Sequence, residues 1–217
     1  MAVAMSVLLD DLRAETAVLD ALLTPLAPDR WDKPTPAPGW VVRDQVSHLA
    51  HFDEVTTRLI ATFAATDPSA SLPWFGPPMS ATSSMTARLM ETWAHGQDVA
   101  DALGVTREPT ARLRHVAHLG VAARSFAFAN RGLAPPAEPV HVALTAPHGA
   151  VWTWGPPDAA ATVRGPAEDF CLLVTRRRHR DDLALDAHGD AAKRWLHVAQ
   201  AFAGPPGRDR VPRGKAP

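Results

Sequence analysis

The sequence predicts a mainly α-helical protein, with a four-helix bundle followed by a small α+β unit. Three observations support this fold class. Apolar residues in the first half of the chain recur every three or four positions, which is the period of an amphipathic helix. Stretches rich in proline and glycine separate these periodic segments. After prolines at positions 135, 136 and 139 the pattern changes to short runs rich in Val, Thr and Trp, which are typical of strands.

The first two helices are defined by their apolar spacing. Residues 6–26 carry leucines at intervals of three and four, and Pro25 and Pro28 mark the end of this helix. Residues 29–39 contain three prolines and a glycine and are expected to form an ordered loop. The second helix is expected over residues 42–65.

The third and fourth helices are bounded by capping residues. Serines within residues 80–84 can cap the start of the third helix, and Gly104 can end it. The fourth is expected over residues 110–131 and is closed by Gly132. Four such helices joined by loops predict a bundle over residues 1–134.

A small α+β domain is expected over residues 135–205, and the tail at residues 206–217 is expected to be mobile because it is rich in Pro, Gly and Arg. The elements expected in the domain are a hairpin of residues 141–145 and 150–154 and helices near residues 167–175 and 191–203.

Composition excludes several classes of protein. The chain has 217 residues, 46% of them hydrophobic, so it can bury a core. The net charge of −1 argues against a dedicated nucleic-acid binder. The N-terminus lacks a signal-peptide pattern and no apolar run is long enough to span a membrane, so a cytoplasmic location is expected. Nucleotide-binding glycine motifs and a G-x-S-x-G elbow are absent.

The single cysteine and the ten histidines narrow the chemistry further. Because Cys171 is the single cysteine, an internal disulfide and a multi-cysteine metal site are excluded. Cys171 lies in an apolar helical stretch and is expected in the core. If the reaction needs a thiol, a cofactor must bring it. Many histidines beside carboxylates raise the hypothesis of a His/carboxylate metal site.

The second helix carries one inward-facing histidine and one inward-facing carboxylate. Steps of three and four from His48 reach apolar residues, so His48 is expected to point inward, as a core histidine or as a ligand. Asp53 shares a stripe with apolar residues, and a buried carboxylate needs a partner.

The third helix holds Glu91 and His95 four residues apart, on one face, where they can chelate one divalent cation. They also belong to a polar stripe with Arg88 and Asp98. On periodicity alone, a solvent-facing ladder of ion pairs is the favoured interpretation.

Two further groups of polar residues are candidates for binding a substrate. The run of Arg176, Arg177 and Arg178 follows a helix C-terminus, where cations are favourable, and it can also clamp a carboxylate. His118 on the fourth helix can line a cavity.

Three segments together resemble one family. The stretch APGWVVRDQVSHL at residues 37–49 resembles the opening motif of DinB-like proteins, and more closely that of the mycothiol-dependent maleylpyruvate isomerase family of actinobacteria. ETWAH at residues 91–95 resembles the E-x-x-x-H of its third helix, and residues 165–177 resemble its C-terminal domain.

The resemblance implies a DinB-like bundle that binds one divalent ion through His48, Glu91 and His95, in place of the solvent-facing ladder. Zinc is the first expectation, and nickel, iron or manganese also suit these donors. Asp53 and Asp98 are then expected to contact the ligands without binding the ion.

The resemblance also implies a chemistry and a substrate site. In the family, a metal-activated thiol, mycothiol, adds to the double bond of an unsaturated diacid, and related members transfer the thiol to electrophiles. Arg177 is the first expectation for the substrate carboxylate, with Arg176 or Arg178 next and His118 beside the substrate. No catalytic residue beyond the metal ligands is assigned.

Three function classes stay open. The first is a metal-dependent, mycothiol-using isomerase or S-transferase that acts on a small, carboxylate-bearing molecule. The second is a thiol-independent metal-dependent hydrolase, lyase or cyclase that tailors small secondary metabolites. The third is a non-catalytic metal-binding protein. The expected partner is a small molecule, without nucleic acid or membrane, and the sequence leaves a homodimer open.

Overall fold

The computed structural model describes residues 3–50, 67–72, 79–207 and 210–212, and the chain divides into two compact units. The first unit comprises Met1–Glu108 and the second Pro109–Pro217. Within the described residues, no helix is both long and apolar enough to cross a membrane.

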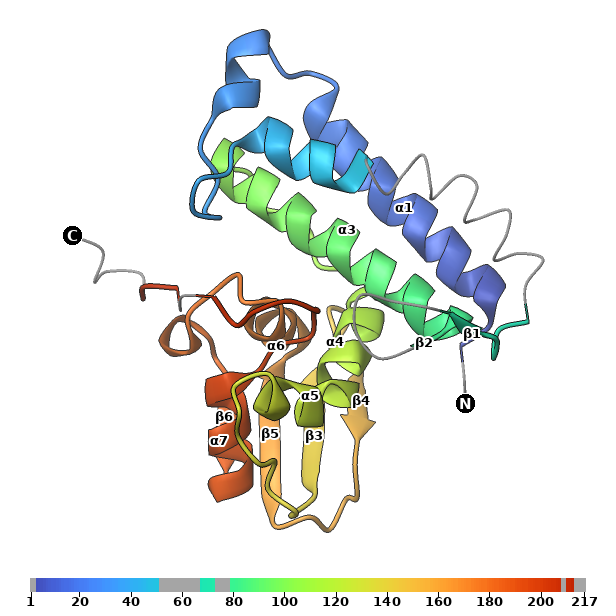
Figure 1. Cartoon of the computed structure of the whole chain (residues 1–217), viewed down its shortest axis with the longest axis vertical. Helices are drawn as coiled ribbons and strands as arrows, with labels where there is room; N and C mark the ends of the chain where they lie inside the picture. Colours follow the sequence, from blue (N-terminus) through green and yellow to red (C-terminus); the bar gives the residue numbers. More distant parts are fainter. Residues whose placement is uncertain (1–2, 51–66, 73–78, 208–209, 213–217) are drawn as a thin grey trace. The chain divides into compact units, whose positions relative to one another are not determined.

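The first unit is built from α1 (Met5–Leu23), a helical segment at residues 42–50 and α3 (Ala81–Leu103), which run alongside one another in Figure 1. The inward face of α1 is the leucine stripe that the sequence predicts, with Leu8, Leu12 and Leu19 buried. The second helix is helical over residues 42–50, and the rest of its predicted span lies outside the described residues.

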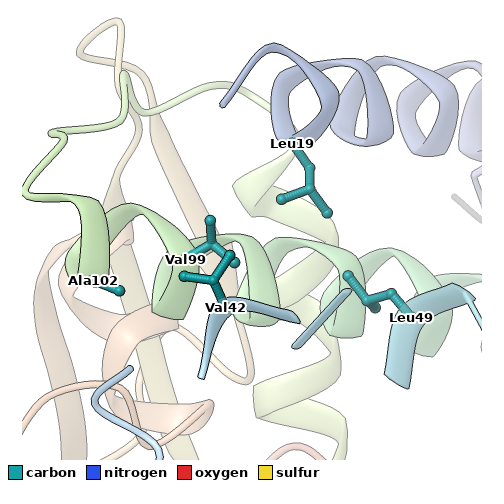
Figure 2. Close-up of a cluster of buried hydrophobic side chains, with 5 residues drawn as sticks. All are labelled: Leu19, Val42, Leu49, Val99 and Ala102. Carbon is teal, nitrogen blue, oxygen red and sulfur yellow. The ribbon is translucent and has the colours of Figure 1, made fainter. Parts of the chain in front are cut away.

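A compact apolar cluster joins these three elements at one end of the unit. Figure 2 shows Leu19 from α1, two residues from the 42–50 segment and two from α3 meeting side by side. The residues of this cluster are Leu19, Val42, Leu49, Val99 and Ala102. Because Val42 and Leu49 lie at the two ends of the 42–50 segment, their burial fixes which of its faces looks toward α3.

The ends of α3 follow the predicted capping chemistry. The Ser80 side chain accepts a hydrogen bond from the backbone N–H of Ser83, which satisfies one free donor of the first turn. At the other end Gly104 adopts a left-handed conformation with φ of 71°, which glycine tolerates without strain. The start and end of α3 are therefore fixed locally by the sequence.

In the described connections of the first unit lie η1 (Pro28–Asp32) and the paired strands β1 (Ser71–Leu72) and β2 (Met79–Ser80). The segment that contains η1 is predicted as a loop, and the two-residue strands β1 and β2 are too short to leave a periodic pattern in the sequence.

The second unit contains a four-stranded mixed sheet in the order β4-β3-β5-β6. The predicted hairpin is confirmed as β3 (Val140–Thr145) and β4 (Val151–Trp154), which pair antiparallel. Strand β5 (Ala161–Pro166) lies on the other side of β3 and runs parallel to it, and β6 (Asp186–His188) pairs antiparallel with β5. Strands β5 and β6 are not among the predicted elements, because the strands that they pair with are distant in sequence.

The helices described in this unit are α4 (Leu113–Ala122), α5 (Arg124–Ala129), α6 (Ala167–Val174), the 3-10 helix η2 (Arg180–Asp182) and α7 (Asp190–Val198). Helix α6 matches its predicted span closely, and α7 ends earlier than predicted. Helix α4 packs on α6 and α5 packs on α7, while α6 and α7 both contact β5.

The described residues do not confirm the predicted bundle, and the two compact units meet at a different residue from the predicted boundary. The expected fourth helix, residues 110–131, is divided into α4 and α5, and both belong to the second unit. The boundary falls between residues 108 and 109 and not after residue 134. The apolar face of α4, which carries Leu113 and Val116, packs against α6, and periodicity reveals such a face without naming its partner. The mainly α-helical class with a C-terminal α+β region holds, whereas a four-helix bundle is not confirmed.

The contact between α4 and α6 is close at Gly120. A Cβ atom added at Gly120 would lie 2.8 Å from Val174 Cγ2 and 3.1 Å from Phe170 Cε1. We therefore expect Gly120→Ala to lower the free energy of unfolding by about 1–2 kcal/mol, because overpacking outweighs the gain in helix propensity. Urea unfolding measures the change.

A double-mutant cycle with Val174→Ala provides the control for this prediction. Removing the valine methyl groups makes room at position 120, so the added methyl group should cost less in the Val174→Ala background than in the native one. Equal costs in both backgrounds would show that the two helices do not meet as described.

Candidate functional site

The candidate site begins with a tight loop ahead of the 42–50 segment. Pro34 and Val41 form an antiparallel bridge, and the backbone N–H of Thr35 donates to the carbonyl of Trp40 at 2.8 Å. Gly39 makes the turn with φ of 79°, a conformation that favours glycine. The Asp44 carboxylate accepts from the N–H of Val41, as in a capping box, and so fixes the start of the helix.

The three predicted metal ligands lie together. One ligand atom from each of His48, Glu91 and His95 lies within 4.8 Å of the others. Figure 1 locates the elements that carry them: His48 comes from the 42–50 segment and the other two from α3. The spacing of four on α3 stacks the imidazole over the carboxylate, with His95 Nε2 at 3.1 Å from Glu91 Oε2.

The cluster is largely enclosed but remains accessible. The side chain of His95 is 11% exposed and that of Glu91 is 28% exposed, while His48 is half-buried. Partial burial protects the donors from competing water, and the exposed part of Glu91 leaves a path for an ion or ligand to approach. Two imidazoles and one carboxylate are the donor set of an open, catalytic type of zinc site.

An aromatic ring covers the two histidines. The centroid of the Trp40 ring lies 5.5 Å from that of His48 and 6.0 Å from that of His95, and Trp40 is stacked on the latter ring. The two imidazole centroids are 4.6 Å apart. Trp40 therefore limits the directions in which either imidazole can turn.

A buried glutamine contacts the other nitrogen of His95. Gln45 is fully buried, and its Oε1 lies 2.5 Å from His95 Nδ1. Its amide nitrogen donates to the hydroxyl of Thr35 at 2.9 Å. The loop and the helical segment are thereby connected to the candidate ligand on α3.

The polar stripe of α3 faces the protein and not solvent. Arg88 is 6% exposed and donates from Nη2 to the carbonyl of Leu49 at 3.0 Å. Asp98 is 1% exposed. The interpretation of this stripe as a solvent-facing ladder of ion pairs is therefore wrong, because its members point toward the 42–50 segment or into the interior.

Of the two carboxylates predicted to contact the metal ligands, the structure describes only Asp98. Asp98 is buried on α3, one turn after His95, and its contact with a ligand stays a prediction. Asp53 lies outside the described residues.

The residues predicted to bind a substrate belong to the second unit. Arg176 adopts a left-handed backbone conformation with φ of 59°, which is uncommon for a residue with a side chain. Arg177 donates to the carbonyl of Thr175 at 2.7 Å, and Arg178 donates to that of Arg177 at 2.8 Å. These arginines end α6 in a tight turn, and their role toward a substrate stays a prediction.

His118 lies at the surface of α4. Its Nδ1 accepts a hydrogen bond from Trp154 Nε1 at 3.3 Å. Partial covering of the ring lowers the pKa of His118 below its usual value, and the nearby charges of His115 and Arg114 lower it further. His118 is therefore mainly neutral near pH 7, and its predicted role beside the substrate is likewise untested.

Sequence reasoning missed Trp40, Gln45 and Thr35. Gln45 precedes His48 by three residues, so the helical walk that picked out His48 could have placed the amide on the same face. Thr35 and Trp40 are brought in by the turn at Gly39.

Two parts of the chain match known protein families. Residues 12–62 and 49–100 match a family described as the mycothiol maleylpyruvate isomerase N-terminal domain, and this range contains all three candidate ligands. Residues 136–188 match a second family, described as wyosine base formation, over β3 to β6.

Similar full-length chains are found among sequences and structures. An uncharacterised protein of Mycobacterium tuberculosis, from strains CDC 1551 / Oshkosh and ATCC 25618 / H37Rv, is 48% identical over 92% of this chain and 96% of its own length. Crystal structures of the mycothiol-dependent maleylpyruvate isomerase and of a histidine-to-alanine mutant share the fold, with TM-scores of 0.53 and 0.55. Each is 14% identical over 85% of this chain and 93% of that chain. Through this N-terminal domain, the chain belongs to the mycothiol-dependent maleylpyruvate isomerase family.

Proposed function

We propose that this protein is a divalent-metal-dependent enzyme that uses mycothiol on a small, carboxylate-bearing electrophile, as an isomerase or an S-transferase. The observation that carries the proposal is the convergence of His48, Glu91 and His95 within 4.8 Å inside the family's N-terminal domain. We take the thiol, mycothiol, and the type of reaction from the names of the matched family and of the similar crystal structures.

The chemistry of the donors supports a metal ion at this cluster. His48, Glu91 and His95 would hold it, and the mixed nitrogen and oxygen set suits zinc first, with nickel, iron and manganese as alternatives. A bound divalent ion lowers the pKa of a thiol that coordinates it, so the reactive thiolate forms at neutral pH.

The chain's own thiol cannot take this role. Cys171 is fully buried on α6, and its Sγ faces the carbonyl of Leu113. Burial raises the pKa of the Cys171 thiol well above its usual value, and the negative charge of Glu168 raises it further. Because the thiol form is unreactive, a nucleophilic thiolate must come from a small molecule.

The protein residues would then bind and orient the reactants. Trp40 restricts the two imidazoles on one side, and burial of His95 excludes water from most of the cluster. An arginine of the 176–178 turn, Arg177 first, would pair with the substrate carboxylate, since a guanidinium fork matches two carboxylate oxygens.

The metal site is tested by elemental analysis of protein purified without chelating resin. We expect one divalent ion per chain in the native protein, and its loss in His48→Ala and His95→Ala because two donors alone bind such ions weakly. His197→Ala, at an exposed position on α7, is the control and should keep the ion. A stoichiometric ion in His95→Ala would refute the site.

The thiol is tested by titrating mycothiol into zinc-loaded protein in a calorimeter. We expect saturable heat with the free thiol and much weaker binding of its S-methyl derivative, which cannot form a thiolate. If no heat appears with zinc, nickel, iron or manganese, the thiol part is wrong, and a thiol-independent hydrolase, lyase or cyclase becomes the better description.

The role of Arg177 is tested by steady-state kinetics with an unsaturated dicarboxylate that supports turnover. Arg177→Ala should raise KM by about 10- to 100-fold, as expected for the loss of a hydrogen bond to a charged group. Its metal content should stay native. A native KM would remove Arg177 from the substrate site, and Arg176→Ala and Arg178→Ala would then be compared.

The inertness of Cys171 is tested with a thiol reagent such as 5,5′-dithiobis(2-nitrobenzoic acid). We expect one thiol per chain to react in guanidinium chloride and essentially none in the native protein over the same time, because the sulfur is fully buried. Rapid reaction of the native protein would contradict the buried position and reopen a role for this cysteine.

A further inference from the structure

The two nitrogens of the His95 ring have different partners. Nε2 faces Glu91 Oε2 at 3.1 Å, on the side of the proposed ion, and Nδ1 faces Gln45 Oε1 at 2.5 Å. A neutral imidazole carries one proton, and only the nitrogen without it can bind a metal. The position of that proton therefore decides whether His95 presents a lone pair to the cluster.

A chain of hydrogen bonds favours a proton on Nδ1. The carbonyl of Trp40 can only accept, so the hydroxyl of Thr35, at 2.9 Å, donates to it. The Thr35 oxygen then accepts from the amide nitrogen of Gln45. This leaves Gln45 Oε1 as an acceptor toward His95, and Nδ1 must supply the proton.

The reverse orientation of the amide loses a contact. If the amide nitrogen of Gln45 faced His95, the Thr35 hydroxyl would have to donate to Gln45 and give up its bond to the Trp40 carbonyl. The Trp40 carbonyl would then keep only the hydrogen bond from the backbone N–H of Thr35. The network thus favours one orientation, and its direction is set by a backbone carbonyl in the loop.

We propose that Gln45 is a positioning residue that holds His95 as the Nδ1–H tautomer and thereby presents Nε2 to the metal ion. The inference rests on the proposed metal site and adds a residue to it. Gln45 and His48 lie three residues apart on the 42–50 segment, so one short helix supplies a ligand and also orients a second ligand on α3.

Two readouts test the proposal. The first is the tautomer of His95 in the metal-free protein, measured by ¹⁵N NMR of histidine-labelled samples and assigned with His95→Ala. The second is the Zn²⁺ dissociation constant from competition with a chromophoric chelator. The first readout needs neither metal nor thiol, so it stands apart from a failure of the proposed function.

The variants separate orientation from simple loss of packing. Gln45→Leu removes the acceptor and should weaken Zn²⁺ binding by about 10- to 100-fold, as is typical when a partner of a metal-bound histidine is lost. Gln45→Glu keeps an acceptor and should bind Zn²⁺ at least as tightly as the native protein. Gln97→Leu is the matched control, because Gln97 is also buried but donates to Asp101.

Thr35→Val tests the direction of the network with less disturbance of the core. Without the hydroxyl, the Gln45 amide loses its preferred orientation, so both tautomers of His95 should appear in the metal-free protein. This variant and the native spectrum decide the matter if Gln45→Leu does not fold.

The results that overturn the proposal are clear. A native His95 found mainly as the Nε2–H tautomer contradicts it directly. The proposal also fails if Gln45→Leu folds, keeps the Nδ1–H tautomer and binds Zn²⁺ with a dissociation constant within about twofold of the native value. Losing the partner of a metal-bound histidine is expected to weaken binding by about 10- to 100-fold.

Discussion

The packing of the 42–50 segment against α3 is the contact on which the candidate site depends. Leu49 and Val99 share one apolar cluster (Figure 2). The buried guanidinium of Arg88 donates to the carbonyl of Leu49, next to the candidate ligand His48. A shift of one residue between these elements would rotate His48 by about 100° away from the face that carries Glu91 and His95. Apolar burial supplies the affinity between the two elements, and the Arg88 hydrogen bond selects their register.

A second buried contact holds α3 in place within the first unit. The guanidinium of Arg107 pairs with the carboxylate of Glu15, which is 1% exposed, and also donates to the carbonyl of Trp93 at 2.9 Å. Gly96 lies against this guanidinium, where an added Cβ would be 3.3 Å from Nη1. Because a buried charge is costly when its partner is lost, the pair ties α1 and the end of α3 together. The helix that carries two candidate ligands is thus fixed at both the apolar cluster and this ion pair.

Local signals predicted many of the elements, and long-range partners explain most of the differences. Ser80 and Gly104 marked the ends of α3 because capping depends only on nearby backbone groups. The hairpin of β3 and β4 was predicted from two short runs rich in Val, Thr and Trp. Strands β5 and β6 escaped because their pairing joins segments far apart in the chain, and α4 was assigned to the first unit because an amphipathic pattern does not identify what covers it.

The sequence by itself determined the helical class, the inward face of α1 and, through the family resemblance, the triad His48, Glu91 and His95. The pair on α3 is a local geometry, since a spacing of four stacks two side chains on any helix. Only the tertiary structure decided that the polar stripe around this pair faces inward and that a buried glutamine contacts one histidine ring. Burial and hydrogen-bond partners arise from elements that meet in space, and Gln45 lies 50 residues before His95 in the chain. The arrangement of the three candidate ligands is therefore a property of the fold.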